Sequence, residues 1–179
     1  MENIKVMIPE ERLLARVREL AEQITEDYAG CELKLICILK GSVFFTTELA
    51  KRINLPIKLD FMSVSSYGDD TESSGRVRIV KDIDESIRGH HVLVVEDIVD
   101  SGRTLSFLLE LLQSRQPASL ALCTLLDKPS RRVTDVQVQY TGFEIPDEFV
   151  VGFGLDYAQK YRALPYIGIL SITDDDVEG

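Results

Sequence analysis

Apolar residues along this chain recur at two spacings, and the alternation of these spacings predicts an α/β fold. Spacings of three and four residues predict amphipathic helices at 9–28 and 105–115, and a turn at 40–42 leads into a third helix at 43–52. Compact or alternating apolar runs predict strands at 33–39, 57–61, 77–79, 92–95, 120–126, 136–140, 149–153 and 167–170. Strands that alternate with helices are typical of an open, mainly parallel sheet flanked by helices. Because no repeat or linker divides the chain, we expect one domain over residues 1–179.

A long polar stretch, 68–75, separates two of these predicted strands. The stretch is too extended for a tight hairpin turn, so we expect it to join an antiparallel pair as a long loop. Long polar loops in compact domains often serve as lids.

The segment from Val92 to Thr104 holds the strongest indication of chemistry. Four consecutive apolar residues predict a strand buried on both faces, and Glu96 and Asp97 follow at its end, where open α/β sheets bind ligands. Residues 101–104 then lie at the start of a predicted helix, whose free N–H groups and positive dipole suit an anion. A simple capped turn would not account for three carboxylates within 96–100. The segment therefore predicts a ligand with phosphate, sugar hydroxyls and a divalent metal.

The net charge of the chain narrows the range of functions that the sequence allows. The net charge of −10 argues against a general nucleic-acid-binding protein, which needs a basic surface. An anionic substrate would then need a metal ion or local lysine and arginine side chains. No apolar run approaches the roughly 18 residues of a membrane span, and residues 1–9 lack an export signal. We therefore expect a cytoplasmic protein with no membrane or nucleic-acid partner.

The cysteines and histidines do not predict a metal site. The three cysteines, Cys31, Cys37 and Cys123, are odd in number, and two lie in strand-like runs, which favours buried free thiols in a reducing compartment. His90 and His91 are adjacent, so they would point to opposite faces of a strand; we expect them at a junction between a loop and a strand.

The segment 92–104 closely resembles the phosphoribosyl-pyrophosphate signature of the type I phosphoribosyltransferases, and the spacing of Glu96 and Asp100 resembles that of the hypoxanthine-guanine branch. A second match to this family runs from Glu144 to Tyr157, and the whole resemblance spans about 34–162. It implies the type I phosphoribosyltransferase fold, with a small hood and a mobile antiparallel flap that begins at 66–67.

The activity that the resemblance implies is a purine-salvage reaction. The 5-phosphoribosyl group would pass from phosphoribosyl pyrophosphate to a 6-oxopurine, with Mg²⁺ as cofactor, giving a nucleoside 5′-monophosphate and pyrophosphate. Hypoxanthine, guanine and xanthine stay open as the preferred base. We also expect a homo-oligomer, either a dimer or a tetramer.

The resemblance also implies a role for each matching residue. Asp100 would be the general base at purine N7, and Glu96 and Asp97 would hold ribose hydroxyls and Mg²⁺. Lys128 would contact the exocyclic oxygen of the base, although a solvated lysine at a strand end is the simpler interpretation. The remaining implied contacts are pyrophosphate with Lys40, Gly41 and Arg162, the 5′-phosphate with Asp100, Ser101, Gly102, Arg103 and Thr104, the base with Phe149 and Val150, and a second Mg²⁺ with Asp156.

Three positions bear on the roles that the resemblance implies. Ser42 stands where the family commonly has a second glycine, which leaves the geometry of the Lys40 loop open. In the family the peptide between Leu39 and Lys40 is often cis. Without the resemblance, Phe149 would be interpreted as a core residue.

Two other classes of protein compete with this interpretation. A regulator that senses phosphoribosyl pyrophosphate and binds nucleic acid should have a basic face and could lack Asp100 or Lys128, whereas this chain is acidic and has both. A nucleotide-binding oxidoreductase would need a glycine-rich turn after the first core strand, and 40–42 is not one. The fold alone would exclude neither.

Overall fold

The computed structural model describes residues 2–66 and 77–172. The expected flap loop at 68–75 and Tyr67 lie outside the described residues. The helices are α1 (Glu10–Asp27), α2 (Val43–Ala50) and α3 (Arg103–Ser114), with a short 3-10 helix η1 (Pro129–Arg131). The strands are β1 (Glu2–Ile8), β2 (Leu33–Ile38), β3 (Ile57–Ser66), β4 (Val77–Lys81), β5 (His91–Val99), β6 (Ser119–Asp127), β7 (Tyr140–Glu144), β8 (Val150–Val151) and β9 (Ile167–Ile172).

The main sheet has the strand order β4-β3-β2-β5-β6-β7. Five of these strands run parallel, and β4 pairs antiparallel with β3 at one edge. The expectation of an open, mainly parallel sheet with an antiparallel pair is therefore confirmed.

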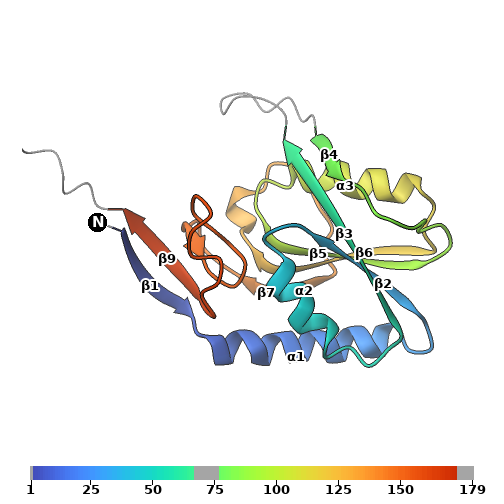
Figure 1. Ribbon diagram of the computed structural model, residues 1–179, viewed down its shortest axis with the longest axis horizontal. Helices are drawn as coiled ribbons and strands as arrows, with labels where there is room; N and C mark the ends of the chain where they lie inside the picture. Colours follow the sequence, from blue (N-terminus) through green and yellow to red (C-terminus); the bar gives the residue numbers. More distant parts are fainter. Residues whose placement is uncertain (1, 67–76, 173–179) are drawn as a thin grey trace, which may run out of the picture.

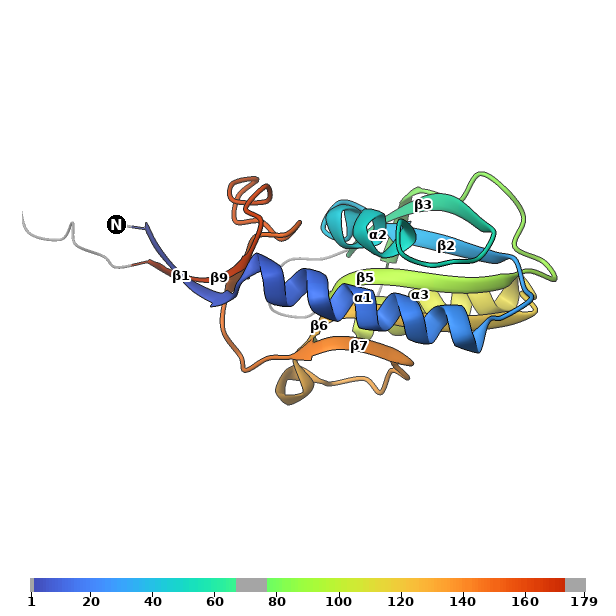
Figure 2. The ribbon, with the colours of Figure 1, turned by 90° about the horizontal axis from the view of Figure 1, so that it is seen from below.

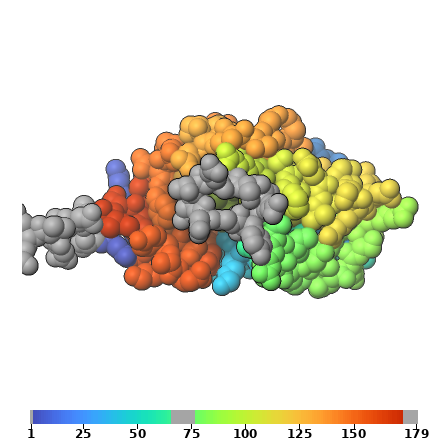
Figure 3. Space-filling model, turned by 90° about the horizontal axis from the view of Figure 1, so that it is seen from above, coloured from blue at the N-terminus to red at the C-terminus, as the bar shows by residue number. Residues whose placement is uncertain are grey.

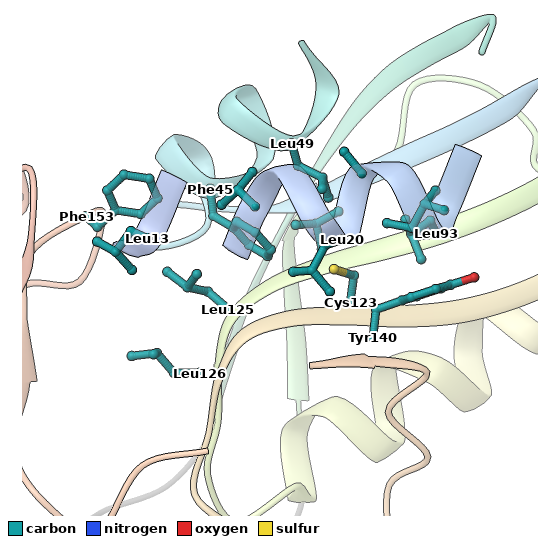
Figure 4. Close-up of a cluster of buried hydrophobic side chains, with 14 of the residues drawn as sticks. Leu13, Leu20, Phe45, Leu49, Leu93, Cys123, Leu125, Leu126, Tyr140 and Phe153 are labelled. Carbon is teal, nitrogen blue, oxygen red and sulfur yellow. The ribbon is translucent and has the colours of Figure 1, made fainter. Parts of the chain in front are cut away.

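Helices cover both faces of the main sheet (Figures 1 and 2). On one face, α1 and α2 bury side chains such as Leu20 and Phe45 against Leu93 and Cys123, as Figure 4 shows. On the other face, α3 packs Leu108 and its neighbours against the sheet. The fully buried strand β2 lies between these two layers, as the continuous apolar run predicts.

A second, three-stranded antiparallel sheet, β1-β9-β8, lies at one end of the molecule and forms the hood (Figure 1). The sequence pattern does not predict β1, because its only buried residue is Ile8 and its other side chains are exposed or half-buried. Its pairing partner, β9, comes from the other end of the chain, with Glu2 opposite Ile172.

Several strand predictions are wrong in extent. β3 continues past the predicted 57–61 as far as Ser66. β5 does not end before Glu96 but continues to Val99, because pairing with β6 is maintained as far as Val99 opposite Asp127. The stretch 136–139 is not a strand. The side-chain oxygen of Gln139 accepts the hydrogen bond of the Leu122 N–H, which a backbone carbonyl would accept in a regular pair of strands. In 149–153, only 150–151 is strand, since Gly152 and Phe153 have φ of 98° and 48°.

The structure confirms the burial of the two cysteines in strands and the position of the histidine pair, whereas Cys31 is only half-buried. Cys31, Cys37 and Cys123 are free, and the latter two are buried. His91 begins β5, directly after a loop. In the described part of the chain, no helix is long and apolar enough to cross a membrane.

Candidate active site

The site lies where the connections from the central strands diverge. β2 has β3 on one side and β5 on the other, so the chain leaves β2 toward one edge and later returns to the opposite side. In open α/β sheets, ligands bind at the carboxyl ends of the strands at such a point. The loop after β2 carries Lys40 and Gly41. The loop after β5 carries residues 100–102, and Arg103 and Thr104 follow in the first turn of α3.

The Lys40 loop has the geometry that the family resemblance implies. The Leu39–Lys40 peptide is cis. Ser42 is buried, and its hydroxyl donates to the Ile38 carbonyl at 2.6 Å and lies 3.3 Å from the Cys37 sulfur. Its φ of −89° needs no glycine. Ser42 thus turns its side chain inward, and burial raises the pKa of the neighbouring Cys37 thiol.

Two close contacts fix this loop against the rest of the site. A Cβ atom on Gly41 would lie 1.7 Å from Asp97 Oδ2, so the carboxylate of β5 rests directly against the loop backbone. A Cβ atom on Gly154 would lie 2.0 Å from the Gly41 carbonyl oxygen. In Figure 3 a light-blue surface, the colour of the segment between β2 and α2, lies between an orange-red surface and a green surface.

Glu96 and Asp97 form a crowded carboxylate pair at the end of β5. Burial raises the pKa of both groups, and the charge of Asp97 raises that of Glu96 further. The Ile98 N–H donates to Asp97 Oδ1 at 2.7 Å, but neither carboxylate forms a salt bridge with any described residue. A divalent cation would relieve the repulsion in such a donor set.

The loop after β5 builds a small anion-sized pocket of about 160 Å³, lined by residues between Glu96 and Leu105. Gly102 precedes α3 with φ 81°, and a Cβ there would lie 2.6 Å from the Thr134 carbonyl oxygen, so only glycine fits. The Ser101 carbonyl accepts the N–H groups of Val133 and Thr134 at 2.9 and 3.0 Å, which anchors the loop. Thr104, in the first turn of α3, also lines the pocket, whereas Arg103 begins the helix with an exposed side chain.

Lys128 follows β6 and is 8% exposed, so it is not a solvated exit residue. Its N–H donates to the Val99 carbonyl at 3.0 Å, which places it beside the end of β5. Its Nζ lies 3.7 Å from Asp147 Oδ1.

Sequence reasoning missed Arg131 and Asp147. Arg131 Nε donates to Asp100 Oδ1 at 3.1 Å, and its Nη1 lies 3.6 Å from Asp147 Oδ2. Arg132 forms a salt bridge with Asp127 and donates from Nε to the Asp100 carbonyl at 3.2 Å. The two consecutive arginines lie in the turn after β6, and nothing in the sequence signals that Arg131 and Asp147 contact Asp100 and Lys128.

The hood contributes an aromatic surface. Phe149 is 53% exposed, which contradicts its interpretation as a core residue. Its ring packs edge to face on Tyr157, with centroids 5.7 Å apart. Val150 is buried in β8. An exposed aromatic face beside a polar site is suited to stacking on a planar ligand.

Asp156 and Arg162 are paired with each other in the hood. Arg162 Nη2 lies 3.0 Å from Asp156 Oδ1, and the Gln159 N–H donates to Asp156 Oδ2 at 2.7 Å. Arg162 also donates to the Gly154 carbonyl. Among the described residues, no three carboxylate, histidine or cysteine side chains converge as a metal site, so Asp156 does not join Glu96 and Asp97 in one cluster.

Comparison with known proteins identifies the family. The phosphoribosyl transferase domain model matches residues 8–158. A hypoxanthine phosphoribosyltransferase of Salmonella typhimurium is 53% identical over 174 residues, which cover 96% of this chain and 98% of that protein. A hypoxanthine-guanine phosphoribosyltransferase of Streptococcus thermophilus is 48% identical over 93% of this chain and 92% of its own length. The crystal structure of a hypoxanthine phosphoribosyltransferase from Staphylococcus aureus matches with a TM-score of 0.91 and 51% identity, covering 93% of this chain and 91% of that one. A domain match over most of the chain, joined by such close full-length relatives, establishes that this chain belongs to the phosphoribosyl transferase family.

Proposed function

We propose that this chain is a hypoxanthine phosphoribosyltransferase that transfers the 5-phosphoribosyl group from phosphoribosyl pyrophosphate to a 6-oxopurine. The observation that carries the proposal is the convergence of three features at one edge of the sheet. These are the Lys40 loop, the carboxylate pair of β5, and the anion-sized pocket of residues 100–104. The close relatives bear names that specify the same activity.

The reaction needs positioning more than a protein nucleophile. Purine N9 bonds to C1 of the ribose while the bond from C1 to the pyrophosphate oxygen breaks, and the bonding electrons leave with the pyrophosphate. A glycosyl centre of this kind passes through an oxocarbenium-like state, which the protein stabilises by orientation and electrostatics.

Each part of the site then has a task. Residues 100–104 would hold the 5′-phosphate with N–H groups and hydroxyls at the start of α3. Lys40, Gly41 and Arg162 would hold the pyrophosphate. Phe149 would stack on the base, Val150 would meet its edge, and Lys128 would donate to its exocyclic oxygen.

Asp100 would accept or carry the proton of purine N7. Its side chain is 47% exposed at the mouth of the phosphate pocket, and it therefore remains reachable by a bound base.

The donor set of β5 fits Mg²⁺. Magnesium in such sites takes one or two protein carboxylates and fills its remaining positions with water and substrate oxygens. Glu96 and Asp97 would hold one ion against ribose hydroxyls and pyrophosphate, and Asp156 would hold a second once Arg162 turns to the pyrophosphate. When bound, the metal neutralises charge on the leaving pyrophosphate.

A direct assay tests the proposed function. The purified chain is incubated with Mg²⁺, phosphoribosyl pyrophosphate and hypoxanthine, guanine, xanthine or adenine, and nucleotide formation is followed for each. We expect product with hypoxanthine, and none with adenine, since a 6-amino group offers no acceptor to Lys128. Absence of product with all three oxopurines would contradict the proposal.

Replacing Lys128 with alanine should raise the KM for hypoxanthine while leaving that for phosphoribosyl pyrophosphate almost unchanged. A charge-assisted hydrogen bond to a neutral acceptor contributes about 1.5–3 kcal/mol, which corresponds to roughly a 10- to 150-fold increase in KM. Steady-state kinetics with each substrate varied in turn measures this. Lys51→Ala, at an exposed lysine directly after α2, is the matched control. An unchanged KM for the oxopurines would remove Lys128 from the base site.

Replacing Glu96 with glutamine should weaken magnesium-dependent binding of phosphoribosyl pyrophosphate by about tenfold or more, because an ionic metal contact is lost. Calorimetric titration with and without Mg²⁺ measures the effect, and Glu110→Gln on the exposed side of α3 is the control. Equal affinities of both variants at every magnesium concentration would contradict the role of Glu96.

Three further features complete the proposal. We propose one domain, since Ile8 and Ile167 of the hood share a core cluster with the main sheet.

Three free thiols support a reducing, cytoplasmic location. We also propose a dimer or tetramer, for whose interface exposed apolar side chains such as Val80 and Phe107 are available; light scattering tests the assembly.

A further inference from the structure

Four charged side chains of alternating sign link the two ends of the base site. The order is Lys128, Asp147, Arg131 and Asp100, with contacts of 3.7, 3.6 and 3.1 Å. They come from three segments: the end of β5, the turn after β6, and the loop that leads into β8. The first and last members are the residues that the proposed function assigns to the exocyclic oxygen and to N7 of the purine.

The chemistry of a 6-oxopurine explains why these two residues need intermediaries. The exocyclic oxygen O6, an acceptor, and the ring nitrogen N7, whose proton Asp100 would accept, are neighbours on one edge of the base. The ammonium for O6 and the carboxylate for N7 must therefore lie close together. Without other partners, two opposite charges so placed would pair with each other and fill the space that the base needs.

The structure holds the two charges apart. The Lys128 ammonium is paired with Asp147, and the Asp100 carboxylate is paired with Arg131. No salt bridge joins Lys128 directly to Asp100 in the described part of the chain. Asp147 and Arg131 also contact each other, so both pairs are tied into one unit.

We propose that Asp147 and Arg131 are positioning residues that hold Lys128 and Asp100 at the separation required by O6 and N7. This inference rests on the proposed function. Asp147 acts on recognition of the base through Lys128, and Arg131 acts on the proton-carrying group through Asp100.

The variants that test this should fold. Asp147, Arg131 and Asp100 are 54%, 53% and 47% exposed, and ion pairs at such positions contribute little to stability. Arg132 keeps its hydrogen bond to the Asp100 carbonyl, so loss of the Arg131 contact frees the side chain and leaves the backbone anchored.

Steady-state kinetics with hypoxanthine and phosphoribosyl pyrophosphate separates the two effects. Asp147→Asn should raise the KM for hypoxanthine about three- to tenfold and leave the KM for phosphoribosyl pyrophosphate unchanged. Arg131→Gln should lower kcat by a similar factor, about three- to tenfold. Arg131→Lys should recover most of kcat, since a single contact to Asp100 does not need a planar guanidinium. Glu148→Gln, at an exposed carboxylate with no described salt bridge, is the matched control.

A double-mutant cycle distinguishes positioning from general damage. In the Lys128→Ala background, Asp147→Asn should have no further effect on the KM for hypoxanthine, because its target is gone. An equal effect in both backgrounds would overturn the role of Asp147. Kinetics of Arg131→Gln equal to those of Glu148→Gln would overturn the role of Arg131. Both failures leave wild-type transferase activity intact, whereas an inactive wild-type chain would overturn the proposed function itself.

Discussion

Replacing Asp100 with asparagine should lower turnover by about 10²–10⁴-fold while most of the affinity for phosphoribosyl pyrophosphate survives. Asparagine preserves the shape of the side chain and can still donate a hydrogen bond, but it cannot accept the proton of purine N7. General acid–base catalysis typically contributes a factor of that size. The 5′-phosphate would be held mainly by the N–H groups and hydroxyls of residues 101–104, which the substitution does not remove.

Single-turnover kinetics measures the chemical step in this variant, and equilibrium titration measures its affinity for phosphoribosyl pyrophosphate. The control is Glu22→Gln, which removes an exposed carboxylate on α1 that belongs to none of the site loops. A chemical step within a few fold of the wild-type rate would show that Asp100 is not the general base, even in an active transferase.

Truncating Phe45 to alanine should cost about 3–5 kcal/mol of unfolding free energy, as large core truncations do. Phe45 is fully buried and belongs to the cluster that joins α1, α2 and the sheet (Figure 4). Because α2 begins directly after the Lys40 loop, the packing of this one ring also secures the helix that carries the pyrophosphate loop.

Urea unfolding followed by circular dichroism gives this free energy. Phe44→Ala is a matched control in the same helix turn, since Phe44 is 40% exposed and its truncation should cost clearly less. Equal losses for the two variants would contradict the prediction, because the buried ring of Phe45 would then contribute no more to stability than the exposed ring of Phe44.

The candidate site could be predicted largely from sequence because most of its chemistry is local. Glu96, Asp97 and residues 100–104 are neighbours in the chain, and a strand followed by a helix start is enough to bring them to one edge of a sheet. The placement of Lys128 follows from the same logic, since it comes directly after the neighbouring parallel strand β6.

What sequence reasoning missed depends on segments that meet only in the folded chain. Arg131 and Asp147 come from different loops, and nothing in their local pattern signals that both approach Asp100 and Lys128. The strand β1 escapes prediction for a related reason: it is defined by pairing with β9 at the far end of the chain, not by burial of its own side chains.

The contact between Gly41 and Gly154 has a practical consequence for redesign. A side chain on Gly154 would collide with the Gly41 carbonyl oxygen across the border between hood and sheet, and a side chain on Gly41 would collide with the Asp97 carboxylate of β5. A library that diversifies the base pocket should therefore keep both glycines fixed and vary the exposed ring at Phe149. Replacing the hood by that of a relative would succeed only when the relative also has no side chain at the position that faces the Gly41 carbonyl oxygen.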